Sequence, residues 1–140
     1  MPIRAVVNGV PPTTTPISQA TYADLGGLRL VFVSGQVGRN PDGTLAGPGI
    51  EEQLPAVYAN LGMVVKAAGG SMADIVMLRT YLAREADLPR FRDLRDRLNR
   101  GAWGPGPYPT NTLLVVKALA HADFAVEIEA IAAIGGDVPG

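Results

Sequence analysis

The sequence VEIEAIA at residues 126–132 decides the fold, because it alternates strictly between two kinds of position. In a β-strand, successive side chains point to opposite faces of the sheet. One face of this strand is then wholly apolar, whereas Glu127 and Glu129 lie on the other face, about 7 Å apart. The stretch predicts a strand that packs one side on a core and carries two carboxylates on the other.

Other stretches between turn signals predict further strands. The pair Gly26-Gly27 supplies the positive φ angles of a tight hairpin turn. The arm after this pair, LVFV at residues 30–33, is apolar on both faces, which is typical of a strand covered on both sides. With the closing strand included, the predicted strands are Ile3–Val7, Ala20–Leu25, Leu28–Ser34, Ile75–Leu82, Asn111–Lys117 and Phe124–Ala132.

Two stretches have apolar residues at helical spacing. The first spans about residues 49–68, and its start is expected near Gln53 or just before it because Pro55 is tolerated only in a first turn. The second begins near Asp87, a typical N-cap residue, and is followed by a stiff Gly/Pro-rich loop over residues 101–109. The element order β-ββ-α-β-α-ββ predicts one α+β domain over residues 1–140, with an antiparallel or mixed sheet and two helices on one face.

The composition excludes several classes of function. The 140 residues are 47% hydrophobic and carry a formal net charge of −1, which favours neither disorder nor nucleic-acid binding. No cysteine is present, and the single histidine, His121, cannot build a metal site alone. No signal peptide and no membrane span is visible, so we expect a cytoplasmic protein with no membrane partner. The high apolar content indicates that some surface is buried between subunits.

Five short phrases occur in a specific order, and together they resemble the RidA/YjgF family of reactive-intermediate deaminases. The resemblance covers roughly residues 18–132. The phrases are ISQA at 17–20, VFVSGQ at 31–36, Gln53 with Asn60-Leu61, AAG and DIV at 67–69 and 74–76, and VEIEAIA at 126–132.

This resemblance implies a chorismate-mutase-like fold and a homotrimer whose sheets pack into a central barrel, with ligand clefts between subunits. In deaminase members, an arginine binds the substrate carboxylate, a tyrosine lines the cleft and a glutamate positions water. The reaction hydrolyses enamines and imines, such as 2-aminoacrylate, to a keto acid and ammonia. The resemblance implies neither a metal nor an organic cofactor.

Carried onto this chain, the family pattern is only partly retained. The glutamate corresponds to Glu127, and the Ser-Gly pair corresponds to Ser34 and Gly35. The tyrosine corresponds to Ile17, which has no hydroxyl, and the arginine corresponds to Asn111. An asparagine cannot make the bidentate, charge-assisted contact that arginine makes with a carboxylate. We therefore expect a divergent member whose small-molecule substrate is not the ordinary 2-aminoacrylate.

Several alternatives stay open at this point. Arg95 either covers apolar surface with its stem or supplies the cation that is missing at Asn111. Glu127 either activates water in an enzyme, or the same cleft holds a metabolite without turnover. A ribonuclease activity, attached to some members of the family, is disfavoured because basic and aromatic patches are absent.

Overall fold

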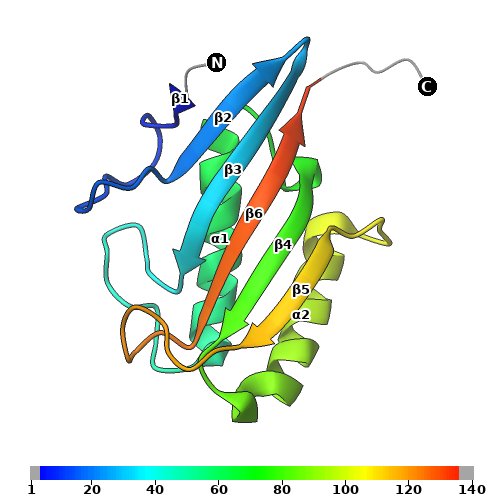
Figure 1. The fold of residues 1–140 in the computed structure, drawn as a ribbon. Coiled ribbons are helices and arrows are strands. Elements are labelled where there is room, and N and C mark those ends of the chain that lie inside the picture. The colour runs from blue at the N-terminus through cyan, green and yellow to red at the C-terminus, as the bar shows by residue number, and fades with distance from the viewer. Residues whose placement is uncertain (1–3, 136–140) are drawn as a thin grey trace.

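The structure, a computed structural model, describes residues 4–135 and contains one mixed sheet with two helices on one of its faces (Figure 1). The strand order is β1-β2-β3-β6-β4-β5, and every pair is antiparallel except β4 and β5. The elements are β1 (Arg4–Ala5), β2 (Ala20–Leu25), β3 (Leu28–Val37), α1 (Ile50–Ala67), β4 (Ile75–Leu82), α2 (Leu88–Trp103), β5 (Thr110–Val115) and β6 (Val126–Ile134). The α+β class and the predicted element order are confirmed.

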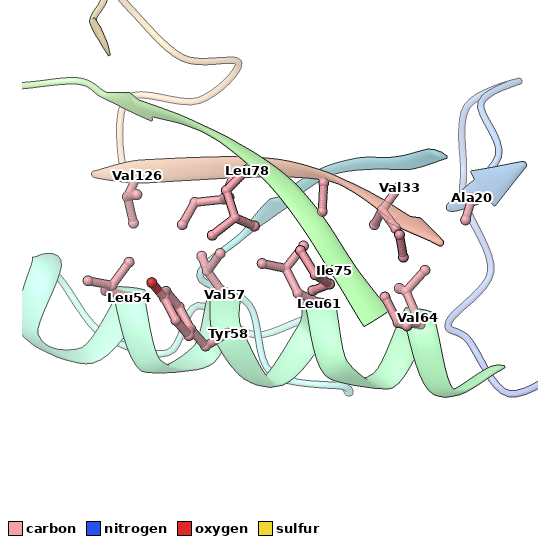
Figure 2. Close-up of a cluster of buried hydrophobic side chains, with 14 of the residues drawn as sticks. Ala20, Val33, Leu54, Val57, Tyr58, Leu61, Val64, Ile75, Leu78 and Val126 are labelled. Atoms are coloured by element: carbon pink, nitrogen blue, oxygen red, sulfur yellow. The ribbon is translucent and has the colours of Figure 1, made fainter. Parts of the chain in front are cut away.

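The core lies between the sheet and α1, and the closing strand is at its centre. Strand β6 lies between β3 and β4, and the side chains of Val126, Ile128 and Ala132 on its helix-facing side are fully buried. Residues of α1 at helical spacing, such as Leu54 and Leu61, pack against this side (Figure 2). Each large aliphatic side chain buried here stabilises the fold by about 1.5–3 kcal/mol. The alternation of residues 126–132 therefore determines which face of the sheet is covered.

The first helix begins at Ile50, three residues before the position predicted from Pro55. Gly49 is the N-cap, and its N–H donates to the Glu52 carboxylate at 3.2 Å, so a capping interaction starts the helix early. The amide of the fully buried Gln53 fixes the first turns through backbone groups of Gly47, Asp123 and Ala125. These contacts outweigh the backbone hydrogen bond that Pro55 cannot make.

The second helix continues to Trp103, so the predicted loop over residues 101–109 begins only at Gly104. Trp103 packs edge-on against Tyr58, with ring centroids 6.3 Å apart, and its indole N–H donates to the carbonyl of Met72 at 2.7 Å. Burial of this indole pulls the last turn into helical geometry. Asp87 occupies the N-cap position but makes no side-chain capping bond, because a 3₁₀ turn over residues 85–87 gives it helical dihedral angles.

The hairpin between β2 and β3 turns at Gly26 and Gly27, whose φ angles are +56° and +93°, as predicted. Strands β3 and β6 extend farther than expected, to Val37 and Ile134, whereas the first strand is reduced to two residues. Ile3, the start of that predicted strand, lies outside the described residues. Within residues 4–135, no helix has the length and apolar character needed to cross a membrane.

Candidate functional site

The sheet face opposite the helices carries the candidate carboxylates among apolar side chains. Glu127 and Glu129 lie on this open face, because their neighbours on β6 point into the core. Phe32 of β3 pairs with Ile131, and its side chain is 46% exposed. On the edge strand β5, Leu114 is 48% exposed. The open face is therefore an apolar surface with charged groups embedded in it.

A β-bulge in β3 places Ser34 and Gly35 opposite Glu129 of β6. Val33 pairs with Ala130 and Gln36 pairs with Ile128, so two residues of β3 lie opposite one residue of β6. The hydroxyl of Ser34 donates to the carbonyl of Ser18 at 2.7 Å.

The side chain of Glu127 packs directly over Gly35. A Cβ atom added at Gly35 would lie 2.8 Å from both Cδ and Oε1 of Glu127, closer than side chains approach in proteins. Gly35 is thus the residue type that leaves room for the Glu127 carboxyl group.

Glu127 is partly buried and makes no hydrogen bond or ion pair with the residues that the structure describes. Burial raises the pKa of its carboxyl above the usual value, and the nearby charge of Glu129 raises the pKa further. A carboxyl group of this kind can accept a proton from water nearer to neutral pH than an ordinary glutamate.

Asn111 and Arg95 lie together, but on the helix side of the sheet. Asn111 is next to Leu78 in the β4–β5 register, and its Oδ1 accepts a hydrogen bond from the buried Thr80 hydroxyl at 3.1 Å. Asn111, Arg95 and Tyr108 line a groove of about 290 Å³ between α2 and β5. The guanidinium of Arg95 is paired with Asp96 at 2.9 Å, so its charge is already partly compensated.

Ile17 lies on the open face of the sheet, as Ser34 does. It lines a hollow of about 350 Å³ together with Phe32, Ser34 and Glu129, and its side chain is 60% exposed. Within one chain, the candidate residues therefore form two groups on opposite faces of the sheet. Ile17, Ser34, Gly35 and Glu127 form one group, and Asn111 and Arg95 form the other.

Comparison with known proteins identifies the family. The family model for endoribonuclease L-PSP matches residues 10–134, nearly the whole chain. The chain belongs to this family, which is the RidA/YjgF family.

Curated relatives of this RidA/YjgF chain are deaminases or proteins of the same family. The mouse 2-iminobutanoate/2-iminopropanoate deaminase is 32% identical over 136 residues, covering 95% of this chain and 93% of the mouse protein. The RutC family protein YjgH from Escherichia coli is 36% identical over 99 residues, covering 71% of this chain and 72% of YjgH.

Solved structures of RidA/YjgF proteins share the fold over nearly the full length. YyfA of the Rid protein family from Yersinia pestis is 26% identical, with a TM-score of 0.79 over 95% of this chain and all of YyfA. TdcF from Escherichia coli, crystallised with bound serine, is 27% identical, with a TM-score of 0.75 over 95% of this chain and 98% of TdcF.

Sequence reasoning missed two residues of this RidA/YjgF chain on the open face, Arg79 and Tyr81. The Tyr81 hydroxyl donates a hydrogen bond to Oε1 of Glu129, and a guanidinium nitrogen of Arg79 lies 3.6 Å from the same oxygen. Alternation along β4 puts both residues on one face, but only the register between β4 and β6 brings them to Glu129. That register is a property of the folded sheet, so no local signal in the sequence reports it.

Proposed function

We propose that this RidA/YjgF protein is a small-molecule hydrolase of the deaminase type, which acts on an imine, an enamine or a related unsaturated intermediate. The observation that carries the proposal is the state of Glu127. Its carboxyl is partly buried, has a raised pKa and lies on the open side of the sheet against Gly35. A structural carboxylate on a strand is normally solvated or ion-paired, and Glu127 is neither fully exposed nor paired within residues 4–135.

The proposed chemistry requires one water and no cofactor. Glu127 accepts a proton from water as the water oxygen bonds to the imine carbon, and the π electrons of the C=N bond move to nitrogen. Glu127 returns the proton to that nitrogen, which gives a carbinolamine. Glu127 then takes the proton of the carbinolamine hydroxyl and delivers it to the amine nitrogen, so that the carbonyl forms, the C–N bond breaks and ammonia leaves. An enamine enters the same route after protonation at carbon converts it to the imine.

We propose that the substrate differs from that of the mouse relative, whose name specifies two imino acids, 2-iminobutanoate and 2-iminopropanoate. At the position of the family arginine this chain has the neutral Asn111, which donates and accepts hydrogen bonds without charge. A substrate without a carboxylate, or one that presents it elsewhere, fits this change. Arg95 lines the same groove as Asn111 and is the candidate for a replacement cation.

We further propose that the working unit is a homotrimer with the cleft between subunits. The residues that the family pattern combines in one site lie on opposite faces of the sheet in one chain, so one copy cannot supply them all to one ligand. Exposed apolar side chains on the open face, Phe32 and Leu114 among them, provide a surface for a second copy.

A second candidate function is binding of a small metabolite without turnover. Two observations favour it, since Ile17 and Asn111 stand where the family has a tyrosine and an arginine. TdcF, which shares the fold, was crystallised with serine, so binding of a small amino acid is known for a relative.

The test compares wild-type protein with Glu127→Gln on a panel of imines generated in situ, with and without a carboxylate. We expect wild-type turnover that is faster on the uncharged imines, and a loss of roughly 100-fold in Glu127→Gln. Glu52→Gln, on the helix side of the sheet, is the matched control, because glutamine also completes its capping interaction. Full activity in Glu127→Gln would refute the mechanism, and ligand binding without turnover in the wild type would favour the binding function.

A further inference from the structure

We propose that Glu129, held by Tyr81 and Arg79, is a positioning residue that acts through Glu127. In this arrangement Glu129 is a fixed negative charge that makes Glu127 the carboxyl group that exchanges the proton. This inference rests on the proposed function of Glu127 and adds a role for three residues that the family pattern leaves without one.

The contacts divide the two carboxylates into a bound one and a free one. Tyr81 is directly opposite Glu127 in the register of β4 and β6, yet its hydroxyl donates diagonally to Glu129. Arg79, directly opposite Glu129, adds its positive charge 3.6 Å from the same carboxyl oxygen. Glu127 receives no such contact from any residue between 4 and 135. Strand β4 thus fixes the carboxylate of Glu129 and leaves that of Glu127 available.

The charged groups around Glu127 all come from β4 and β6. Strand β4 presents Tyr81 and Arg79, and β6 presents Glu129. On the other side, β3 contributes Ser34, Gly35 and Val37, none of which titrates. Glu129 is therefore the negative charge that faces Glu127, and its hydrogen bond from Tyr81 sets where that charge lies.

The directions of the pKa shifts of Glu127 and Tyr81 support this arrangement. Burial is the largest cause that raises the pKa of Glu127, and the charge of Glu129 is the second. The hydrogen bond to Glu129 is the largest cause that raises the pKa of Tyr81, so Tyr81 remains a protonated donor throughout the neutral range. When two neighbouring carboxyl groups have environments this different, their roles in proton transfer also differ. Glu127 is then the carboxyl group that exchanges the proton during the reaction, and Glu129 is the one held in place by Tyr81 and Arg79.

Direct titration of Glu127 tests the proposal without any substrate. The side-chain carboxyl ¹³C signal of Glu127 is followed against pH in wild-type, Glu129→Gln and Asp93→Asn protein. At a pH below the Glu127 midpoint, Glu129→Gln should increase the ionised fraction of Glu127 about threefold to tenfold, as expected for a charge about 7 Å away. Asp93→Asn removes the same charge from the exposed side of α2 and should change nothing. An unchanged Glu127 titration in Glu129→Gln would overturn the proposal.

A double variant excludes a simpler explanation. In Glu129→Gln the Tyr81 hydroxyl has only a neutral acceptor at residue 129 and is able to turn toward the charged Glu127, which would also favour the ionised form of Glu127. If the charge of Glu129 is the cause, the altered titration of Glu127 persists in the Glu129→Gln/Tyr81→Phe protein, where residue 81 has no hydroxyl. If it disappears there, the charge of Glu129 is not the cause, and the proposal is wrong.

Kinetics then separates this proposal from the proposed function. If both hold, the acid limb of the kcat/KM profile of Glu129→Gln lies at lower pH, by the amount seen in the titration. If Glu127→Gln keeps full activity, the proposed function fails even where the titration coupling is observed. If Glu127→Gln is inactive but Glu129→Gln leaves both titration and acid limb unchanged, only the role of Glu129 fails.

Discussion

Gly35→Ala is the substitution that moves the candidate base without changing its chemistry. The added methyl carbon would lie 2.8 Å from Cδ, 2.8 Å from Oε1 and 2.9 Å from Cγ of Glu127. Optimal contacts between non-bonded heavy atoms are about 3.5–4.0 Å, so the carboxyl group has to move by roughly 1 Å. Gly35 is not among the glycines with positive φ, so alanine fits the backbone there without strain.

The expected effects on activity and on stability are unequal. A displacement of about 1 Å at a catalytic group costs up to roughly 100-fold in rate, so kcat/KM should fall by about that factor. The atoms that must move are the end of a flexible side chain, so an off-rotamer cost of about 0.5–1.5 kcal/mol in unfolding free energy is expected. A large loss of activity with a small loss of stability is the diagnostic result.

The measurement is imine turnover together with denaturant unfolding, and Gly101→Ala is the matched control. A Cβ at Gly101 in α2 would meet no atom within 4 Å, and alanine in a helix should stabilise the protein by about 0.5–1 kcal/mol. Its activity should match the wild type. Wild-type turnover in Gly35→Ala would show that the position of Glu127 is irrelevant to the reaction, and would refute the reasoning that connects the two residues.

Three further predictions concern assembly, stability and substrate. Phe32→Asp places a charge on the exposed apolar face, so the mass measured by light scattering should fall from about three times 14.6 kDa in the wild type to the mass of one chain. A monomeric wild-type protein would contradict the trimer. The raised pKa of Glu127 means that the folded state binds its proton more tightly than the unfolded chain. Its contribution to stability is therefore present at acid pH and lost as pH rises through the folded pKa, so Glu127→Gln should raise the melting temperature at pH 7 and not at pH 4. Asn111→Arg should increase turnover of carboxylate-bearing imines about tenfold or more, since one charge-assisted bond contributes about 1.5–3 kcal/mol; no increase would indicate that Ile17 has also changed the site.

The pattern at residues 126–132 predicted the fold because each of its positions has an unambiguous side. Val126 and Ile128 are fully buried against α1, as the alternation requires, and this leaves Glu127 on the open face. The span of about residues 49–68 agrees with α1, whereas the later start inferred from Pro55 does not, for a reason that is not local. The Pro55 rule considers one missing hydrogen bond, whereas Gln53 makes its bonds to segments distant in the chain.

The candidate site was predictable only as far as single strands and the family resemblance extend. The resemblance named Glu127 and Gly35 as candidate site residues, whereas their direct contact is known only from the structure. The contacts of Tyr81 and Arg79 with Glu129 require the register of β4 against β6, which the sequence of β4 alone does not specify. In the trimer that we propose, the grouping of Asn111 with Glu127 takes one residue from each of two subunits.

That grouping across subunits can be tested by mixing inactive subunits. Glu127 and Asn111 lie on opposite faces of one sheet, so a site that uses both must take each from a different chain. We expect Glu127→Gln and Asn111→Leu to be inactive alone, the latter because leucine retains the volume of the side chain but removes its hydrogen bonds. When the two are unfolded together and refolded at equal concentration, a cyclic trimer combines an intact Glu127 with a neighbour's intact Asn111 at about one quarter of its sites. Activity should therefore recover to about a quarter of the wild-type value. If mass spectrometry demonstrates mixed trimers but no activity is recovered, no site is shared between subunits and Asn111 acts within its own chain.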